Sequence, residues 1–337
     1  MLELCESIYI GRNETVHKLI WGILIGFIVC VQPISAQDNT YPNKPIKIVV
    51  PYPPGGFNDT LGRILAPKMS EIWKQPVLVE NRTGGVTTIG TSYVASSPPD
   101  GYTMLIIQFP FVTNPFLMKS LPYDTNKAFS PVILAGRSPT VFVTSKDSPY
   151  KTLQDVIKAA KANPGKLNYG SSGNGSSNHL SMALFEKMAN VEMRQIPYKG
   201  STAIMTDVVG GQVDVAIDVL GNMASFLQTG KVRTLAIGQL TRSPLMPQVP
   251  TMNELGITGY DVNSWHAIVV PAGTPRGVID KINQTVNEIL KMSDVKETFR
   301  IQGVVPDGGT PEQLDAFLQS QSNTWGKLIK NLNITAD

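Results

Sequence analysis

The sequence predicts an α/β fold organised as two domains. Short runs of β-branched and apolar residues, typical of buried strands, alternate with segments of helical periodicity along almost the whole chain. About 300 residues follow the N-terminal leader, a length that favours two domains of similar size. Two glycine-rich loops, Pro53–Asp59 and Gly170–Asn178, each follow a strand and open a helix. Because ligands of such folds bind beyond the carboxyl ends of strands, these loops predict one cleft between the domains.

The order of the elements predicts parallel sheets with helical crossovers. The expected strands are Ile46–Val50, Val77–Glu80, Met104–Ile107, Val132–Leu134, Val141–Thr144, Leu167–Tyr169, Met193–Ile196, Val213–Ile217, Val232–Ile237 and Trp265–Val270. The expected helices are Leu61–Trp73, Leu153–Ala162, Leu180–Ala189, Ala203–Val209, Met223–Leu227, Pro275–Lys291 and Pro311–Lys330. Thr310 is a suitable N-cap of the last helix, because Pro311 then stands at its first position.

The first 36 residues have the order of a secretory signal peptide. Basic Arg12 and Lys18 precede the apolar run Leu19–Val31, and small residues end at Ala36. A run of this length is short for a membrane span of about 20 residues, although an uncleaved N-terminal anchor is the alternative. The leader predicts export to the periplasm of a Gram-negative bacterium.

Composition excludes several classes of function for residues 37–337. Both cysteines of the chain, Cys5 and Cys30, lie in the leader, so disulfides and thiol chemistry are excluded beyond it. Without the leader, which carries two basic and three acidic residues, the chain has 27 basic and 23 acidic residues without runs of either sign. Neither a nucleic-acid-binding stripe nor a polybasic membrane patch is therefore expected.

The loop Pro53–Asp59 is interpreted as a cradle for a carboxylate. Prolines stiffen its start, and Gly55 and Gly56 let bare backbone N–H groups approach a ligand at a helix N-terminus, where anions are favoured. Asn58 or Asp59 is expected to cap the helix. The alternative is an ordinary strand-to-helix connection. A nucleotide P-loop is excluded because no Lys-Ser/Thr pair follows the glycines, and no GxGxxG occurs.

The loop Gly170–Asn178 supplies further candidate donors to a ligand. Ser171, Ser176 and Ser177 offer hydroxyl groups, Gly173 permits close backbone approach, and His179 stands where an apolar-faced helix begins. The alternative is a flexible surface linker.

A third group of candidates follows two further strands. Tyr198 can line the cleft, and the amides of Gly200 and Ser201 can meet a second group of the ligand. Asp218 ends a buried strand, where it can contact a ligand amine or a water molecule; the alternative is a cap for the next helix.

Catalysis is poorly supported by the residues after the leader. Their two histidines, His179 and His266, belong to no HExxH motif or Cys/His cluster, so neither a metal centre nor another cofactor is expected. No GxSxG nucleophile elbow is found. A triad built on His179 is the alternative, but binding without chemistry fits the residues better.

Many ordered motifs resemble one known family, over nearly all of residues 42–333. They are Tyr41–Ile46, Val50–Asp59, Glu80–Arg82, Pro98–Thr103, Asn114–Pro115, Leu121–Asp124, Ser130–Val132, Gly170–Leu180, Pro197–Gly200, Gly211–Asp214, Pro271–Pro275 and Gly308–Pro311. The chain resembles the periplasmic substrate-binding proteins of tripartite tricarboxylate transporters, the Bug or TctC-like receptors.

This resemblance implies a type II-like, two-domain Venus-flytrap fold that closes over a small carboxylate. The implied division is a signal peptide over 1–36, a discontinuous first domain over 37–142 and 265–337, and a second domain over 143–264. Two crossing strands would join the domains near Val141–Thr144 and Trp265–Val270. The implied contacts come from Gly55–Asp59 on one side, and from Ser171–His179 with Tyr198–Ser201 on the other. The implied partner is a membrane permease with one large and one small subunit, and the receptor is expected to be a monomer.

The chain departs from the family pattern at two places. The family usually continues Asn-Arg with Gly-Ala-Gly-Gly, whereas Val86 and Thr87 follow the glycines here. The segment after Ile107 usually carries small polar residues, whereas this chain has Gln108-Phe109-Pro110-Phe111. Together with Tyr52 and Phe57, these rings could form a flat apolar slot for a carboxylate with an aromatic or bulky body. The alternative is that Phe109 and Phe111 pack in the core.

Three functions therefore compete. The leading hypothesis is a transport receptor, which is not an enzyme. The second is a periplasmic sensor that presents the carboxylate to a membrane sensor kinase through the same clamp. The third is an exported hydrolase, against which the scarcity of histidine weighs.

Overall fold

The computed structural model describes residues 41–335, and the described residues from Lys44 onward form one compact unit. The leader predicted over residues 1–36 lies outside the described residues. The strands are β1 (Ile46–Val50), β2 (Val77–Asn81), β3 (Thr103–Ile107), β4 (Phe129–Ser145), β5 (Asn168–Ser171), β6 (Arg194–Pro197), β7 (Val215–Val219), β8 (Val232–Ile237), β9 (Asn263–Pro271) and β10 (Val305–Gly308). The helices are α2 (Phe57–Trp73), α3 (Thr88–Ala95), α4 (Pro110–Leu117), α5 (Leu153–Ala162), α6 (Ser177–Ala189), α7 (Ser201–Val209), α8 (Leu220–Gln228), α9 (Arg276–Leu290), α10 (Ser293–Ile301) and α11 (Pro311–Asn331).

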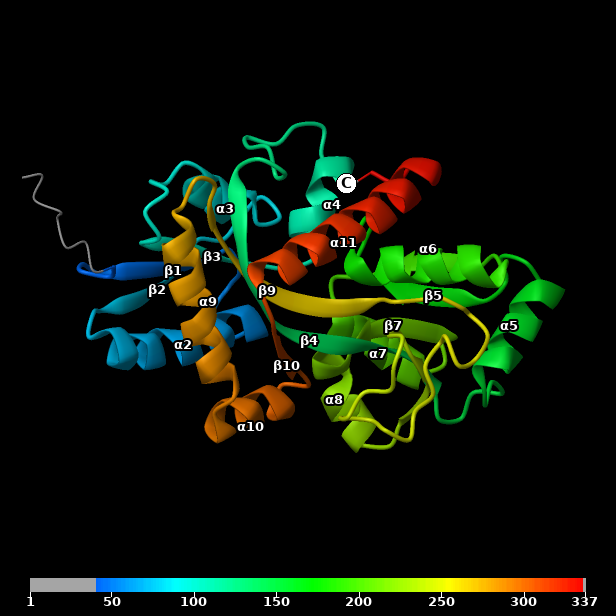
Figure 1. Cartoon of the computed structure of the whole chain (residues 1–337). Helices are drawn as coiled ribbons and strands as arrows, with labels where there is room; N and C mark the ends of the chain where they lie inside the picture. The colour runs from blue at the N-terminus through cyan, green and yellow to red at the C-terminus, as the bar shows by residue number, and fades with distance from the viewer. Residues whose placement is uncertain (1–40, 336–337) are drawn as a thin grey trace, which may run out of the picture. The chain divides into compact units, whose positions relative to one another are not determined.

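The strands form one curled sheet in the order β2-β1-β3-β9-β4-β7-β5-β6, with β8 and β10 also paired to β4. Strand β4 takes part in two sections of this sheet. Its first portion pairs with β9 and β10, and its last portion pairs with β7 and β8. Figure 1 shows β1–β3 on one side and β5 and β7 on the other, with β4 and β9 running between them.

The sheet is mixed, so the prediction of parallel sheets is correct only for part of it. Strands linked by helical crossovers, such as β1 with β2 and β5 with β7, are parallel. The pairings of β4 and β9 are antiparallel, because these long strands cross between the two sections and run against each other. The strands predicted separately over Val132–Leu134 and Val141–Thr144 are both part of β4. Register shifts near Pro131 and Gly136 accommodate the residues that interrupt its apolar pattern.

Local capping explains several helix starts. Thr310 caps α11 with Gln313 in a capping box, and Pro311 stands in the first turn, as the sequence predicted. The expected cap of α2 is wrong, because Gly56 occupies the N-cap position. The Asp59 carboxylate instead reaches back to accept a hydrogen bond from the Gly55 N–H, at 3.1 Å.

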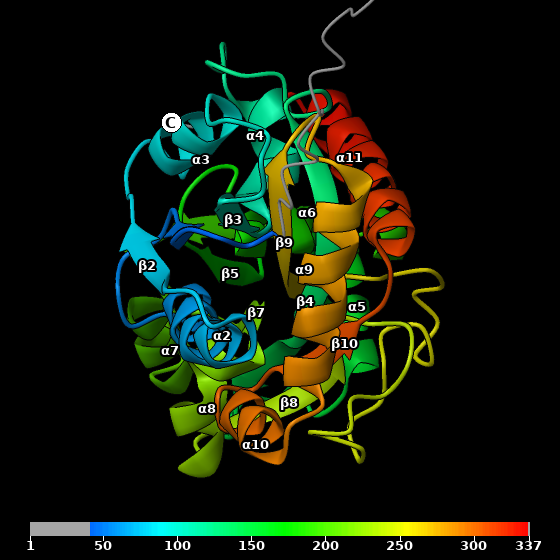
Figure 2. The same cartoon turned by 60° about the vertical axis from the view of Figure 1, so that its left-hand side comes forward.

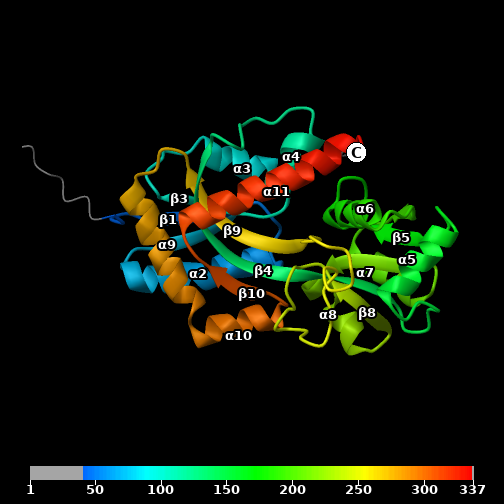
Figure 3. The ribbon, with the colours of Figure 1, turned by 45° about the vertical axis from the view of Figure 1, so that its right-hand side comes forward.

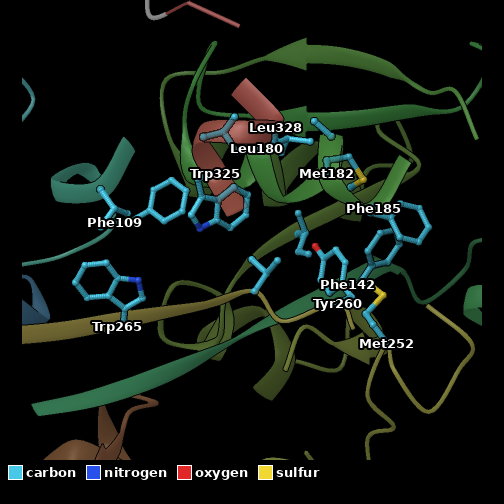
Figure 4. Packing of buried hydrophobic residues seen from close by; sticks show 14 of the residues in the cluster. Phe109, Phe142, Leu180, Met182, Phe185, Met252, Tyr260, Trp265, Trp325 and Leu328 are labelled. Atoms are coloured by element: carbon cyan, nitrogen blue, oxygen red, sulfur yellow. The ribbon is translucent and has the colours of Figure 1, made fainter. Parts of the chain in front are cut away.

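Alternate residues of β4 face two different hydrophobic clusters. Phe142 packs with Phe185, at 5.0 Å between ring centroids, inside the larger cluster that Figure 4 shows. Val141 and Val143 face the smaller cluster with residues of α7 and α8. This alternation is the period-two pattern of a strand buried on both faces.

Helices α9 and α11 both pack against β4 (Figure 2). Helix α11 also contacts α4 and α6 (Figure 3). Helix α4 follows β3 and helix α6 follows β5, and these two strands lie in the two different sections of the sheet. Its Trp325 is fully buried and meets the Phe109 ring edge-on, at 4.9 Å between centroids. The larger cluster is therefore continuous from α4 to α6.

One partly buried carboxyl group predicts a pH dependence of stability. Burial raises the pKa of Glu186 in α6 to about 7, although its carboxylate accepts a hydrogen bond from the Met193 N–H. The folded protein therefore holds a proton that the unfolded chain loses near pH 4.5. The resulting stabilisation is present below about pH 4.5 and is lost as the pH rises through about 7.

We expect Glu186→Gln to remove this part of the pH dependence, because glutamine keeps the acceptor but cannot ionise. After allowance for solvent screening, the difference between pH 5 and pH 8 should be about 1 kcal/mol in the free energy of unfolding. Urea unfolding of both proteins at the two pH values measures it. Parallel pH profiles for the two proteins would contradict the assignment.

Candidate functional site

A cavity of about 550 Å³ lies between α4 and the loop that joins β5 to α6. It is lined by Val86, Gln108, Phe109, Pro110, Thr113, Asn114, Leu117, Met118, Thr140, Ser172, Gly173, Asn174, Gly175, Ser176, Ser177, Asn178, Ser181, Ile217, Asp218, Val219, Asn222, Val262, Asn263 and Ser264. Among these described residues, Asp218 is the only one with an ionisable side chain. The wall is therefore rich in neutral polar groups and contains no cationic side chain.

Three helices begin at this wall. Phe109, Ser176 and Val219 are the N-cap residues of α4, α6 and α8, and all three line the cavity. The first N–H groups of a helix lack partners within it, and the helix dipole places partial positive charge at the same end. The Asp218 carboxylate already accepts a hydrogen bond from the Val219 N–H at the start of α8. The cavity therefore offers an anion the ends of α4 and α6 without a positively charged residue.

Asn178 organises the loop between β5 and α6. Its Oδ1 accepts hydrogen bonds from the Ser172 N–H at 3.0 Å and from the Ser176 hydroxyl at 2.7 Å, and its Nδ2 donates to Ser172 Oγ. Gly173 and Gly175 have φ values of +101° and +73°, which glycine adopts most readily. These bonds hold the loop in place, so the alternative of a flexible surface linker is not supported.

A chain of four side chains ends at the cavity. The Asn58 Nδ2 donates to Gln108 Oε1 at 3.1 Å, so the Asn58 Oδ1 faces His266 Nδ1, at 2.7 Å. His266 must then carry its proton on Nδ1, and burial lowers its pKa to about 3, so the ring is neutral. The Gln108 Nε2 donates to Ser264 Oγ at 2.7 Å. Because Ser264 accepts at this end, its hydroxyl proton is available to an acceptor in the cavity.

Asp218 ends β7 and is held by several donors. Its Oδ2 accepts from the Ser201 hydroxyl at 2.5 Å, and its Oδ1 accepts from the Val219 N–H at 2.7 Å and from Asn222 Nδ2 at 3.0 Å. Burial raises the pKa of this carboxyl group, although the hydrogen bonds from Ser201, Val219, Asn222 and Asn178 act in the opposite direction.

The predicted site residues divide into three groups. Those that line the cavity are Gln108, Phe109, Gly173, Ser176, Ser177 and Asp218. Those hydrogen-bonded to a lining residue are Asn58, Ser171, His179 and Ser201. Those that the structure does not bring to this wall are Tyr52, Gly55, Gly56, Phe57, Asp59, Tyr198 and Gly200. Contact of the last group with a ligand stays a prediction.

The predicted carboxylate cradle already holds a carboxylate, that of Asp59. Besides the Gly55 N–H, the Asp59 carboxylate accepts from Arg63 Nε at 2.9 Å and from Asn81 Nδ2 at 2.9 Å. These bonds, with Arg63 first, lower the pKa of Asp59 to about 2. The interaction that the sequence assigned to a ligand is thus made by the chain itself in this structure.

The aromatic rings of the predicted slot lie apart. Phe109 lines the cavity, whereas Phe111 packs against Phe129 in the core, at 5.3 Å between centroids. Phe57 meets His266 and Phe299 at 4.4 and 4.9 Å. Of these phenylalanines, Phe109 alone lines the described cavity.

The loop before α3 contains backbone strain beside the cavity. Val86 and Thr87 have φ values of +50° and +76°, which cost a β-branched residue about 1–3 kcal/mol each. The Asn114 Nδ2 donates to the Val86 carbonyl at 2.8 Å and helps to hold this conformation. Val86 is 58% exposed and extends the apolar side of the wall.

Sequence reasoning missed several polar residues of the wall. Asn222, Asn263 and Ser264 were not among the candidates, although Asn222 follows Asp218 by four positions at the start of a helix. That position could have indicated Asn222, because a side chain in the first turn of a helix can reach back to the end of the preceding strand, as the Asn222 Nδ2 does to Asp218 Oδ1. No sequence signal distinguishes Ser264, which depends on the pairing of β9.

Within residues 41–335, no group of three or more metal-ligating side chains comes together. The helices of the described part of the chain include none that is long and apolar enough to cross a membrane.

Comparison with known proteins identifies the family. The family model described as "Tripartite tricarboxylate transporter family receptor" (TctC) matches residues 61–334. The chain belongs to this receptor family. The resemblance drawn from the sequence motifs is thereby confirmed, and the family comprises periplasmic solute receptors.

Three similar proteins illustrate the relationship. The receptor is 39% identical to a protein of Pseudomonas sp. (strain P51) described as "UPF0065 protein in tcbD-tcbE intergenic region", over 97% of this chain and 96% of that protein. It is 35% identical to BugT of Bordetella pertussis, over 94% and 98% of the two chains. The structure of R. palustris Rpa4515 with adipate is 34% identical, with a TM-score of 0.73 over 88% and 99% of the chains. The two-domain α/β binding-protein fold predicted from the sequence is confirmed by this likeness.

The hydrogen-bonded series of side chains from His266 through Asn58 and Gln108 to Ser264 predicts an effect on stability. We expect Asn58→Ala to lower the free energy of unfolding by about 1–3 kcal/mol, because it leaves the buried His266 N–H and Gln108 carbonyl without partners. Urea unfolding measures the change. Asn323→Ala, on the exposed side of α11, is the matched control and should change stability by less than about 0.5 kcal/mol. Equal effects of the two substitutions would show that this hydrogen-bonded series contributes nothing to the free energy of unfolding.

Proposed function

We propose that this receptor binds a small carboxylate in the cavity and delivers it to a tripartite tricarboxylate transporter permease with large and small subunits. The observation that carries the proposal is that the N-terminal ends of α4 and α6 both lie at a wall without cationic side chains. Such a wall binds a carboxylate through N–H and hydroxyl donors rather than through an ion pair. The adipate in the related Rpa4515 structure supports a carboxylate ligand.

The composition of the wall indicates a ligand with an apolar body. Val86, Phe109, Pro110, Leu117 and Met118 supply apolar side chains from α4 and the loop before α3. Serine and asparagine side chains from the loop before α6 supply polar groups, and the volume is ordinary for a small-molecule site. A carboxylate on an aromatic or otherwise bulky body fits a wall with one apolar side and one polar side better than a ligand that carries charged groups at every end.

The domain division follows from the same geometry. We infer a first domain over 37–142 and 265–337 and a second over 143–264, because β4 pairs with different strands in its two portions. The cavity then lies between residues of both domains.

The remaining elements of the proposal follow from the leader and the family. Residues 1–36 would direct export to the periplasm of a Gram-negative bacterium and be cleaved. The exported receptor would act as a monomer, without catalysis and without a cofactor.

The proposal is tested by thermal unfolding of the purified protein with a panel of acids. The panel contains adipate and other dicarboxylates, citrate, amino acids, nicotinate, benzoate and phthalate. An acid present at about 100 times its dissociation constant should stabilise the folded state by about 2.7 kcal/mol, a shift of a few degrees. A shift confined to one chemical class supports the proposal and names that class. No shift with any acid would overturn it.

The role of Phe109 is tested against a neighbour of equal burial. Phe109→Ala and Phe111→Ala each remove a ring that is 7% exposed and should cost a similar 3–5 kcal/mol in stability, roughly. Only Phe109 lines the cavity, so we expect its loss to weaken binding of a bulky or aromatic panel acid about tenfold, by calorimetry. Phe111→Ala should change the dissociation constant less than about threefold. Equal affinities of the two variants would remove Phe109 from the site.

A further inference from the structure

Asp218 is a buried carboxyl group in a cavity that favours anions. Its side chain lies in the wall with 7% of the residue exposed, and the described lining contains no lysine, arginine or histidine. Its hydrogen bonds come from neutral donors, namely Ser201, the Val219 N–H, Asn222 and Asn178. Its negative charge is therefore stabilised by dipoles alone.

The elements packed against β7 carry few charges. They are β4, β5, α6, α7 and α8. Their ionisable residues, with the lysine that precedes α7, are Arg137, Tyr169, His179, Glu186, Lys187, Lys199 and Asp207. Arg137 pairs with Asp307, Glu186 accepts from the Met193 N–H, and Asp207 accepts from the Tyr198 hydroxyl. None of the described cationic side chains forms an ion pair with Asp218.

A ligand carboxylate in this cavity would lie in the same space that the buried Asp218 carboxylate lines. Two carboxylates that share a desolvated site do not both remain ionised easily, because each disfavours the charged form of the other. Neutralising one of the two therefore favours the charged form of the other, and the described cavity wall supplies no cation that could do so.

Asp218 is built to accept a proton without losing a hydrogen bond. Its Oδ2 faces the Ser201 hydroxyl at 2.5 Å, and a hydroxyl group can either donate or accept after rotation. When Oδ2 is protonated, its O–H can donate to Ser201 Oγ, while Oδ1 keeps the bonds from Val219 and Asn222. The Ser201 proton then becomes available to another acceptor.

We propose that binding of a carboxylate in this cavity takes up one proton on Asp218 Oδ2, so that affinity rises as the pH falls. The proton comes from the solvent or its buffer, an O–H bond forms on Asp218, and the ligand binds as the anion. This inference rests on the proposed function and specifies how pH regulates ligand binding at the same site.

Isothermal titration calorimetry of the purified protein tests the proposal directly. The probe is adipate, or the panel acid with the largest thermal shift if adipate gives none. Each titration is made between about pH 5 and 8 in two buffers of different ionisation enthalpy, whose difference in heat counts the protons taken up. We expect up to one proton per ligand and a dissociation constant that rises by up to about tenfold per pH unit.

Asp218→Asn is the matched variant, because its side chain is similar in shape but cannot ionise. This variant should bind the probe without taking up a proton at Asp218. Any proton uptake by the probe itself still occurs in the variant, and it is subtracted from the uptake of the unaltered protein. If this variant fails to fold, the number of protons that the unaltered protein takes up per ligand still tests the proposal. Binding with no proton uptake by the unaltered protein, or equal uptake by both, would overturn the inference alone. Absence of binding by every panel acid would instead overturn the proposed function.

Discussion

The pairing of β4 is the constraint on which the rest of the structure depends. This one strand forms hydrogen bonds with β9 and β10 in its first portion and with β7 and β8 in its last. Because successive side chains point to opposite faces, Phe142 joins one hydrophobic cluster while Val141 and Val143 join the other. A register slip of one residue would exchange these faces, so the pairing determines both cores at once. The same pairing brings Thr140 and, through β9, Ser264 to the cavity.

The proposed anion site in the cavity contains no positively charged side chain among its described lining residues. The N-terminal ends of α4 and α6 and the Ser264 hydroxyl present donors whose positions are set by the backbone or by buried hydrogen bonds. Such donors need little reorganisation when a ligand binds. Lysine and arginine have long side chains whose conformational freedom would be lost in binding. The absence of a cation also leaves Asp218 without a counter-charge, which makes its protonation state sensitive to the charge of the ligand.

The two glycine-rich loops have become chemically different despite their similar composition. In the loop before α2, the Asp59 carboxylate takes the Gly55 N–H and is paired with Arg63. In the loop before α6, the neutral side chains of Asn178 and Ser176 organise the backbone and cap the His179 N–H, so that no charged group occupies this helix end. The difference follows from the charge of the side chain in the first turn, because an acidic residue there occupies the position that an external anion would take.

The hydrophobic periodicity of the sequence, together with its turn and helix-capping residues, determined the α/β class, the succession of most elements and the capping of α11. These signals are local, since hydrophobic spacing and capping residues act within a few positions of the chain. Ordered motifs also identified the receptor family and placed the loop before α6 at the site. The mixed pairing of the sheet, the unity of β4 and the separation of Phe109 from Phe111 were decided by tertiary structure. So was the chain from His266 through Asn58 and Gln108 to Ser264. Its members lie up to 208 positions apart, and hydrogen bonds between such distant residues exist only once the strands have paired.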